Sequence, residues 1–476
     1  MPMSEQDVEQ VTALQPPTKN DKEAWKAYWK AHGQMWRTEP EIDMERQKFL
    51  TKQQNIIPDI EKGIYLFKGI RLSRADVEWL LATYENGLGP IDWSDNNQRD
   101  RTGLDLRGAD LCKVNLSGLP LARTCWGLIY RSRSNETDEQ RETAGACLEG
   151  TDFREASLEG SYFRGANLNK ANLSRAHLAQ ADLSRANLAD ATLREVNMCK
   201  AILIRSHLEG AILSGTNLEG ADLRGAHFEG AILHRANLIG ADLRRAFFNT
   251  ATSLDDIILS RGKDGCARLA GVHWGDVDLS VVNWKSVKVL GDEQKAHQPK
   301  TSKGEMRQGS ERVYYYRAAV RSTRQLAIML RDQGLGGFAD YFAYRARVLY
   351  RMERWWQLWS KEQIQKPLSW VQLLVAWVLS MLFDVLAGYG YKPERAVFCY
   401  LVVIISFTIT YVIFGHLLPL QALVFSLTSF HGRGFSPGEN VTLDNPLTVL
   451  AAMEAVVGLV IEISLISTVT QRFFGK

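Results

Sequence analysis

Ionisable side chains occur near the end of the chain, where the sequence is otherwise strongly apolar. Glu454 and Glu462 lie within the last apolar run, and His431 and Arg433 lie in the stretch FSLTSFHGRGFSPG that precedes it. Charge is costly inside a membrane and is kept there where it faces a protein interior or water. These residue types are typical of an ion pathway, in which carboxylates attract cations, arginine repels them and histidine titrates near neutral pH. For the two glutamates, structural pairing within a helix bundle is an equal alternative.

No set of side chains predicts catalysis. The chain shows no nucleophile beside a base and no phosphate loop, so we expect neither enzyme activity nor a cofactor. His207 and His227 are one four-unit coil of a repeat apart, but no Cys, Asp or Glu completes a metal set at an obvious spacing. We interpret them as exposed, solvated histidines. The cysteines show no CxxC pairs, and we expect all of them to be reduced and structural: Cys112, Cys125, Cys147, Cys199, Cys266 and Cys399.

Charge and hydropathy divide the chain into two parts. The 57 basic and 54 acidic residues give a net charge of +3, which does not indicate a nucleic-acid partner. Apolar residues gather after Pro367, so a polar part is followed by a membrane part. The first 20 residues are polar and acidic and lack the apolar core of a signal peptide. We therefore expect the polar part to stay on the cytoplasmic side of the inner membrane.

A five-residue repeat fills the middle of the chain, from Ala146 to Thr250. Successive units read ADLSR ANLAD ATLRE, with Leu or Phe at the centre and a small residue two positions earlier. This period fits neither a helix nor a flat strand. It fits a square coil in which each unit forms one side, with the large and the small residue pointing inward.

The pattern A(D/N)LxX resembles the pentapeptide-repeat family, and the resemblance covers roughly residues 104–284. It implies a right-handed quadrilateral β-helix with four units per coil and coils about 4.8 Å apart. The piece LDLRGADLCKVNLSGLPL is expected to form a first coil, from which residues 131–143 loop out. After a break at residues 253–264, the spacing resumes in four residues that we expect to cap the far end: Leu269, Trp274, Leu279 and Trp284.

Some members of this family mimic DNA with an acidic coat and bind type II topoisomerases. Here the outward acidic residues are matched one for one by basic residues, so a mixed surface disfavours that function. Ile202, Ile212 and Ile232 replace the usual Asp or Asn at outward positions. We expect these isoleucines to pack against another subunit or, preferably, against the N-terminal helices.

Helical patterns flank the repeat. Ser73 begins a predicted amphipathic helix with Asp76 at its third position. Basic residues that lead into Trp355, Trp356 and Trp359 are typical of a helix that meets an anionic leaflet. The predicted segments of this mixed fold are a helical capping region (1–100), the β-helix (101–285, with a loop insertion at about 122–145), a linker (286–311), a cytoplasmic helical hairpin (312–366), an interfacial helix (367–391) and a two-transmembrane pore module (392–476).

Three apolar stretches follow, at residues 368–386, 396–415 and 447–470. The last two are long enough to cross a hydrocarbon core of about 30 Å. The first is marginal and contains Asp384. If only the last two cross, the basic residues near their ends all lie inside, as the positive-inside rule prefers. We therefore interpret the first stretch as interfacial and the C-terminus as cytoplasmic, with a third span as the alternative.

Between the two spans lies PLQALVFSLTSF, which is too short to cross and is followed by a glycine-containing loop. This layout is typical of a re-entrant pore loop. Residues 392–476 resemble the two-transmembrane pore module of the potassium-channel superfamily, and the resemblance implies a hinge at Gly458 in the inner helix. The family filter TTVGYGD matches Thr428, Ser429, Phe430 or His431, Gly432, Arg433, Gly434 and Phe435.

Two filter positions depart from the family, because Arg433 replaces Tyr and Phe435 replaces Asp. The resemblance therefore does not assign potassium selectivity, and the permeating ion stays open. We expect an oligomeric ion-channel-like protein in contact with membrane lipid, a homotetramer by family analogy, whose solenoid is an accessory or sensing domain. The alternative is a non-conducting, membrane-anchored scaffold in which the pore fold persists.

Overall fold

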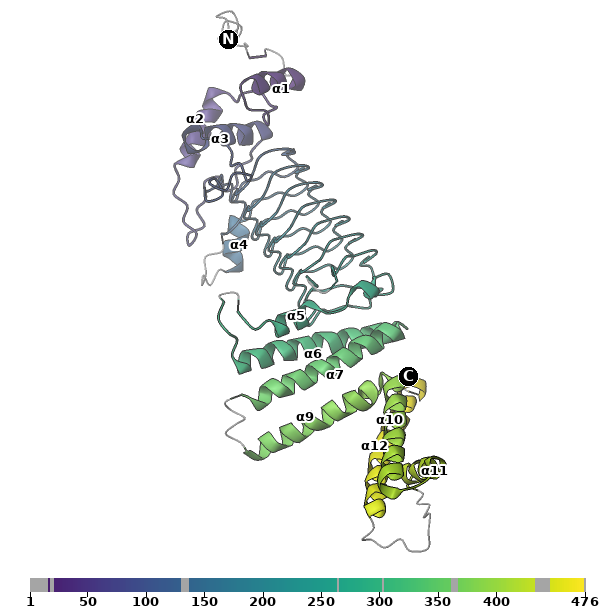
Figure 1. The fold of residues 1–476 in the computed structure, drawn as a ribbon. Helices are drawn as coiled ribbons and strands as arrows, with labels where there is room; N and C mark the ends of the chain where they lie inside the picture. Colours follow the sequence, from purple (N-terminus) through teal and green to yellow (C-terminus); the bar gives the residue numbers. More distant parts are fainter. Residues whose placement is uncertain are drawn as a thin grey trace, which may run out of the picture. The chain divides into compact units, whose positions relative to one another are not determined.

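The computed structural model of the chain describes residues 16–17, 21–129, 137–262, 265–301, 304–360, 367–432 and 446–474. It forms two compact units, residues 1–294 and 295–476, which are described separately (Figure 1). The helices that begin in the first unit are α1 (Lys22–Ala31), α2 (Met44–Gln54), α3 (Arg74–Gly87), α4 (Asp138–Ala144), η1 (Trp284–Ser286) and α5 (Gly291–His297). The helices of the second unit are α6 (Gly309–Asp332), α7 (Gly336–Leu358), α9 (Pro367–Ala387), η2 (Gly388–Gly390), α10 (Pro393–Gly415), α11 (Pro419–Phe430) and α12 (Pro446–Phe474).

The repeat forms a stack of coils. In the part of the chain that the structure describes, no continuous strand occurs, and isolated parallel β-bridges hold neighbouring coils together. Between residues 147 and 247 each bridge joins residues 20 apart, as Cys147 with Asn167 and Asn167 with Asn187. Twenty residues are four units of five, so the predicted coil of four units is confirmed. The central residues are fully buried, among them Leu148 and Phe153.

The corners of the coil need an unusual backbone conformation. From Leu148 to Leu243, the second residue after each central residue has a positive φ, for example 60° at Gln180, 57° at Asp190 and 55° at Arg235. Glycine adopts this region without strain, and other residues pay about 1–2 kcal/mol. Stacking of coil on coil offsets that cost, so side chains other than glycine occupy many corners.

The predicted insertion lies between the first and second coils. Bridges from Asp110 to Cys147 and from Asn115 to Asp152 join residues 37 apart, 17 more than in a regular coil. The first coil continues through Leu128, whose N–H donates to the Arg164 carbonyl at 3.2 Å. The insertion therefore starts later than residue 122, and its described part contains α4.

The predicted break at residues 253–264 is partly wrong. Bridges from Ile232 to Ser253 and from Asn237 to Ile258 continue the stack, one residue longer than a regular coil. Leu254 and Leu259 are buried as the centres of two further units. The extra residue is accommodated just before Ser253, and the interruption proper follows Leu259.

The N-terminal helices lie over the first coil. The predicted capping box is confirmed, because Ser73 and Asp76 bond each other's backbone N–H groups at the start of α3. Arg74 donates to the carbonyls of Asn115 and Ser117 at 3.3 and 3.0 Å, which covers the open edge of that coil. The outward isoleucines lie on later coils, and Ile202 and Ile232 remain 37% and 39% exposed. The preferred expectation that these helices cover the isoleucines is therefore wrong.

The predicted linker begins with a helix. Asp292 in α5 is buried and accepts a hydrogen bond from the Leu269 backbone N–H at 2.7 Å. Burial raises the pKa of Asp292, and the nearby guanidinium of Arg268 opposes that shift. The stretch that starts at Gly291 thus closes the last coils instead of forming an extended tether.

The second unit contains the predicted helical hairpin and the apolar helices. α6 and α7 pack along their whole length, with Leu326, Leu330 and Phe342 buried between them. Three helices are long and apolar enough to cross a membrane by length and composition, at 368–390, 393–415 and 446–466, which fits a membrane-associated protein. α9 is therefore not the marginal segment that the sequence indicated. Its interfacial or spanning position stays a prediction.

Candidate functional site

The half-length helix α11 packs against both long apolar helices, α10 and α12 (Figure 1). α10 ends at His416 in a left-handed conformation, and Pro419 starts α11 in its first turn, where proline is well tolerated. The 12 residues of α11 span about 18 Å, roughly half of a hydrocarbon core. Its two ends pack in separate clusters, one around Tyr411 and Phe425 and the other around Phe430 and Ile461. Contacts at both ends of α11 therefore fix its position against α10 and α12.

The residues aligned with the start of a filter are helical. Thr428, Ser429 and Phe430 form the last turn of α11, and Thr428 Oγ1 donates back to the Val424 carbonyl. Gly432 closes the turn with φ of 65° and a bond from its N–H to the Ser429 carbonyl at 2.9 Å. Thr428, Ser429 and Phe430 therefore belong to the helix α11, and their assignment to a filter stays a prediction. Arg433, Gly434 and Phe435 lie outside the described residues.

Glu454 is bonded inside the bundle. Its side chain is fully buried and accepts hydrogen bonds from the Tyr411 hydroxyl, at 2.8 Å, and from the Ser426 hydroxyl. The three residues come from α12, α10 and α11, so one carboxyl group joins all three helices. This arrangement is the structural pairing that the sequence left as an alternative to a role in permeation.

Gly458 lies where α12 passes the end of α11. A Cβ atom at this position would lie 2.1 Å from the Phe430 carbonyl oxygen, far inside van der Waals contact. α12 is a continuous helix through this point. The structure therefore gives Gly458 a packing function, whereas the resemblance implied a hinge.

His431 and Glu462 form a second link between α11 and α12. His431 Nδ1 bonds a Glu462 carboxylate oxygen, and its Nε2 lies 3.4 Å from the Tyr400 hydroxyl of α10. Both side chains of the pair are partly exposed, at 43% and 35%. Sequence spacing placed both residues in the same region but did not indicate that they touch.

Asp384 joins the helical hairpin to the apolar helices, which sequence reasoning missed. Its carboxylate pairs with Arg351 of α7 at 2.7 Å and accepts a bond from the Tyr344 hydroxyl at 2.9 Å. Arg395 of α10 donates to its backbone carbonyl at 3.0 Å and lies 3.5 Å from its carboxylate. Burial and the bond to Asp384 raise the pKa of Tyr344. Arg351, one of the basic residues that lead into the tryptophans, therefore pairs within the protein.

The tryptophan cluster also makes contacts inside the protein. Trp355 of α7 packs on Trp377 of α9 with ring centroids 5.0 Å apart. Arg312 of α6 lies over the Trp356 ring at 4.2 Å. These contacts tie α6 and α9 to the last turns of α7, and Trp359 remains 57% exposed.

The outward histidines of the solenoid form a column of stacked rings. His207 and His227 stack with centroids 5.2 Å apart, and Phe247 and His273 continue the column at 4.6 and 4.5 Å. The expectation that no acid completes a metal set is wrong. The ligand atoms of Glu209, His227 and Glu229 lie within 4.8 Å of one another.

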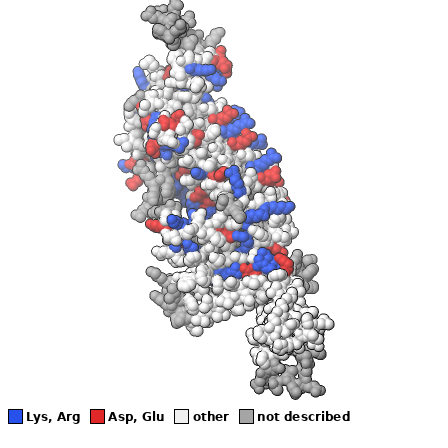
Figure 2. All heavy atoms as spheres, viewed as in Figure 1, with Lys and Arg blue, Asp and Glu red and all other residues white. Residues whose placement is uncertain are grey.

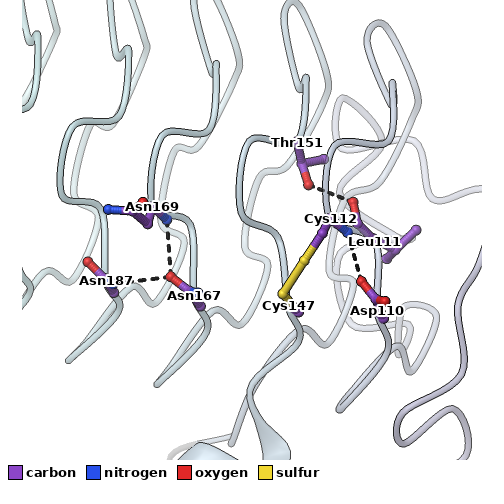
Figure 3. Close-up of a disulfide and its surroundings, with 8 residues drawn as sticks. All are labelled: Asp110, Leu111, Cys112, Cys147, Thr151, Asn167, Asn169 and Asn187. Atoms are coloured by element: carbon purple, nitrogen blue, oxygen red, sulfur yellow. Dashed lines mark hydrogen bonds between the residues drawn. A yellow bond between two sulfur atoms is a disulfide. The ribbon is translucent and has the colours of Figure 1, made fainter.

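Two cysteines form a disulfide in the structure, whereas the sequence predicted that all six are reduced. Cys112 and Cys147 lie on neighbouring coils with Cα atoms 5.7 Å apart, and Figure 3 shows their sulfur atoms bonded across the stack. Cys125 is a buried free thiol, and burial raises its pKa to about 12. A thiol with so high a pKa is inert near neutral pH.

The solenoid surface mixes charges of both signs. Figure 2 shows acidic and basic side chains interspersed along the face in view. Many pairs lie within one unit, as Arg154 with Asp152 at 2.6 Å and Arg224 with Asp222 at 2.6 Å. This face carries no continuous acidic coat.

Comparisons with known proteins identify the middle of the chain. Residues 146–185, 181–220 and 211–249 match the family described as pentapeptide repeats, in eight copies. No curated protein sequence matches the chain. One similar solved structure is a pentapeptide repeat protein from the Arabidopsis thaliana thylakoid lumen, at 23% identity and a TM-score of 0.16. The match covers 26% of this chain and 66% of that protein.

Two further solved structures are similar to part of this chain. Rfr23 from the cyanobacterium Cyanothece 51142 is 28% identical over 35% of this chain and 90% of its own, with a TM-score of 0.16. QnrB1, a plasmid-mediated fluoroquinolone resistance protein, is 19% identical over 39% of this chain and 80% of its own, with a TM-score of 0.22. The middle of this chain is a pentapeptide-repeat region, joined in sequence to apolar helices long enough to span a membrane.

Proposed function

We propose that this chain is a non-enzymatic, oligomeric ion-channel-like membrane protein with a pentapeptide-repeat sensing or accessory domain. The observation that carries the proposal is the position of α11. A 12-residue apolar helix ends between two long apolar helices, and its last carbonyl, that of Phe430, lies against Gly458. A helix that crosses only half of the membrane leaves the residues after it within the hydrocarbon core. Non-helical backbone is tolerated there only where it is buried in protein or lines a water-filled cavity.

Side-chain hydrogen bonds on both sides of α11 support a fixed position for its C-terminal end. Glu454 holds Ser426 and Tyr411 on one side, and His431 bonds Glu462 on the other. Polar groups buried in an apolar bundle keep helices in register when their hydrogen bonds are satisfied. In the proposal, this bracing sets the geometry of the stretch that begins at Gly432.

Further copies of the chain would complete the pathway. Val456, Leu459, Ile463 and Ile466 on α12 are each more than half exposed in the single chain. In a membrane such residues face lipid or another subunit. We propose a tetramer, by analogy with the pore module that the sequence resembles, with both termini on the cytoplasmic side of the cell membrane.

Arg433 would decide the selectivity of the pathway. A ring of arginines around an axis raises the barrier to cations and favours anions. The cytoplasmic hairpin would act on the pathway through Asp384, because that carboxylate holds α7, α9 and the start of α10 together.

Recordings from purified full-length protein in planar bilayers test the proposal. We expect single-channel currents, with a reversal potential in a salt gradient that reports anion preference. Arg433→Tyr should shift the reversal potential toward cations, while Arg433→Lys, which keeps the charge, should not. Absence of current above a lipid blank, with an intact tetramer shown by its mass, would exclude the channel and leave the membrane-anchored scaffold.

A further inference from the structure

A groove of about 570 Å³ runs along one edge of the solenoid. The inserted helix α4 forms one wall, with Asp138, Arg141 and Glu142, and the corners of successive coils form the other. Volumes of this size hold small-molecule ligands in other proteins. The insertion thus turns an otherwise regular face into a bounded site.

One column of the groove carries arginines. Arg185, Arg205 and Arg245 occupy the same corner in three of four successive coils, with φ of 55°, 55° and 60°. Arg185 lies 3.5 Å from Asp138, whereas Arg205 and Arg245 have no ion-pair partner within the described ranges. The groove therefore offers two guanidinium groups that no carboxylate of the described chain neutralises.

The corner between these two arginines is Gly225. It lines the groove with φ of 67°, and a Cβ placed there would meet Arg205 Cγ at 3.4 Å. Coils are about 4.8 Å apart, so Arg205 and Arg245 start about 10 Å apart on either side of it. The missing side chain leaves a recess that both guanidinium groups flank.

The neighbouring column is the stack of rings. Because His207, His227 and Phe247 stack face to face, they present edges and not faces to the groove. Nδ1 of His207 bonds Glu209 at 3.0 Å and Nδ1 of His227 bonds Glu229 at 3.3 Å, so Nε2 is the nitrogen left for a ligand. The column thus presents Nε2 atoms beside the arginines and no ring face to a planar base.

We propose that this groove binds a small molecule through a diphosphate group. The planar fork of arginine matches phosphate oxygens, and two such forks fit a multiply charged anion. The recess at Gly225 gives the anion room between the arginines. This inference goes beyond the proposed ion conduction, and a binding measurement tests it whether or not the protein conducts ions.

Calorimetric titration of the purified full-length protein at low salt tests the site. Pyrophosphate and ADP should bind once per chain, at least about tenfold more tightly than citrate, and more weakly as salt increases. Equal affinities for pyrophosphate and ADP would assign recognition to the diphosphate alone, and a tighter ADP would add contacts to its nucleoside. Both outcomes support the proposal. No binding of either, or citrate binding as tightly, would overturn it.

Variants at matched corners locate the binding. The double variant Arg205→Gln with Arg245→Gln should weaken pyrophosphate binding at least about tenfold. Glutamine fits this backbone, since Gln180 has φ of 60° at the same repeat position. Arg235→Gln is the control, because Arg235 has φ of 55° at the same position and lies outside the groove. Full affinity in the double variant, or an equal loss in the control, contradicts the site.

A second variant keeps both arginines. Gly225→Asp places a carboxylate in the recess, at a backbone position that Asp190 and Asp256 already occupy with φ of 57° and 54°. It should reduce pyrophosphate affinity as strongly as the arginine changes, with an unaltered circular dichroism spectrum. Retained affinity in the folded Gly225→Asp protein would place the ligand elsewhere and refute the inference.

Discussion

The Phe430 carbonyl oxygen lies against the backbone of Gly458, so close that a Cβ on Gly458 would lie 2.1 Å from it. This contact joins the last residue of α11 to the middle of α12. Only glycine permits it, because any side chain would push the end of α11 away. The close approach of the end of α11 to α12 therefore requires glycine at residue 458.

Gly458→Ala should destabilise the packing of α11 against α12. The added methyl group must displace the Phe430 carbonyl, and overpacking of this kind costs about 1–3 kcal/mol. Thermal unfolding of the detergent-purified protein, followed by tryptophan fluorescence, measures the loss. Gly337→Ala in α7 is the matched control, since a Cβ there meets nothing within 4 Å. An unchanged unfolding midpoint for Gly458→Ala would disprove the close contact.

The regular part of the fold was predictable because every five-residue unit shows the same pattern of large, small and polar residues. A large residue at the centre and a small one two positions earlier point inward in every unit, which predicts a coil with one unit per side, and the resemblance to the pentapeptide-repeat family implies four units per coil. The same reasoning could have found the acids beside the histidines, because Glu209 and Glu229 repeat with the same spacing as His207 and His227.

Contacts that depend on chain offset were not predictable. The 17 extra residues before the second coil shift the columns by an amount that sequence does not reveal, so Cys112 and Cys147 could not be aligned. The partners of Asp384 come from two different helices, and which faces meet depends on helix packing. The pattern of apolar residues predicted the helices, but it predicted neither the disulfide nor the ion pairs of Asp384.

Removal of the Asp384 carboxylate should weaken the link between hairpin and apolar helices. Arg351 lies 2.7 Å from the carboxylate with 16% of its side chain exposed, whereas Arg395 lies at 3.5 Å with 40% exposed. We expect Asp384→Asn and Arg351→Gln each to cost about 2 kcal/mol, and Arg395→Gln to cost less. Unfolding midpoints of the three variants give the order. A larger loss for Arg395→Gln than for Arg351→Gln would contradict this assignment.

Stability of the solenoid should depend on pH through Asp242. Burial would raise its pKa, but the bond from Arg244 and the charges of Arg268 and Arg244 together hold that pKa below its ordinary value. A carboxyl group with a lowered pKa stabilises the fold above its unfolded pKa of about 3.9, and this contribution is lost as pH falls through the folded value.

Circular dichroism melts across acidic pH measure this contribution. In wild-type protein the melting temperature should fall as pH decreases below about 4. Asp242→Asn should lower the melting temperature at neutral pH and flatten this dependence. The Arg268 guanidinium lies 2.7 Å from the Asp242 carboxylate. Arg268→Gln removes this cation and should give a dependence of melting temperature on pH between those of the wild type and Asp242→Asn. A wild-type slope in Asp242→Asn would show that other carboxyl groups carry the acid response.

The Cys112–Cys147 disulfide should stabilise the first coils. It closes a loop with a sequence separation of 35, for which loss of chain entropy in the unfolded state gives about 3–4 kcal/mol. Cys112→Ser should lose this amount in oxidised protein, and wild-type protein in reductant should match the variant. Cys199→Ser is the control, since Cys199 is a free thiol. No difference between oxidised and reduced wild type would contradict a stabilising bond.

The same bond tests on which side of the membrane the solenoid lies. Cytoplasmic thiols are kept reduced, whereas disulfides persist outside the cytoplasm. With the proposed cytoplasmic placement, Cys112 and Cys147 in acid-quenched cells should react with a maleimide before any reductant is added, and the disulfide should form only after lysis in air. Cys199, which has no sulfur partner, supplies the reactivity expected of a free thiol in the same sample. Protection of Cys112 and Cys147 alongside reactive Cys199 would place the solenoid outside the cytoplasm and reverse the proposed orientation of the apolar helices.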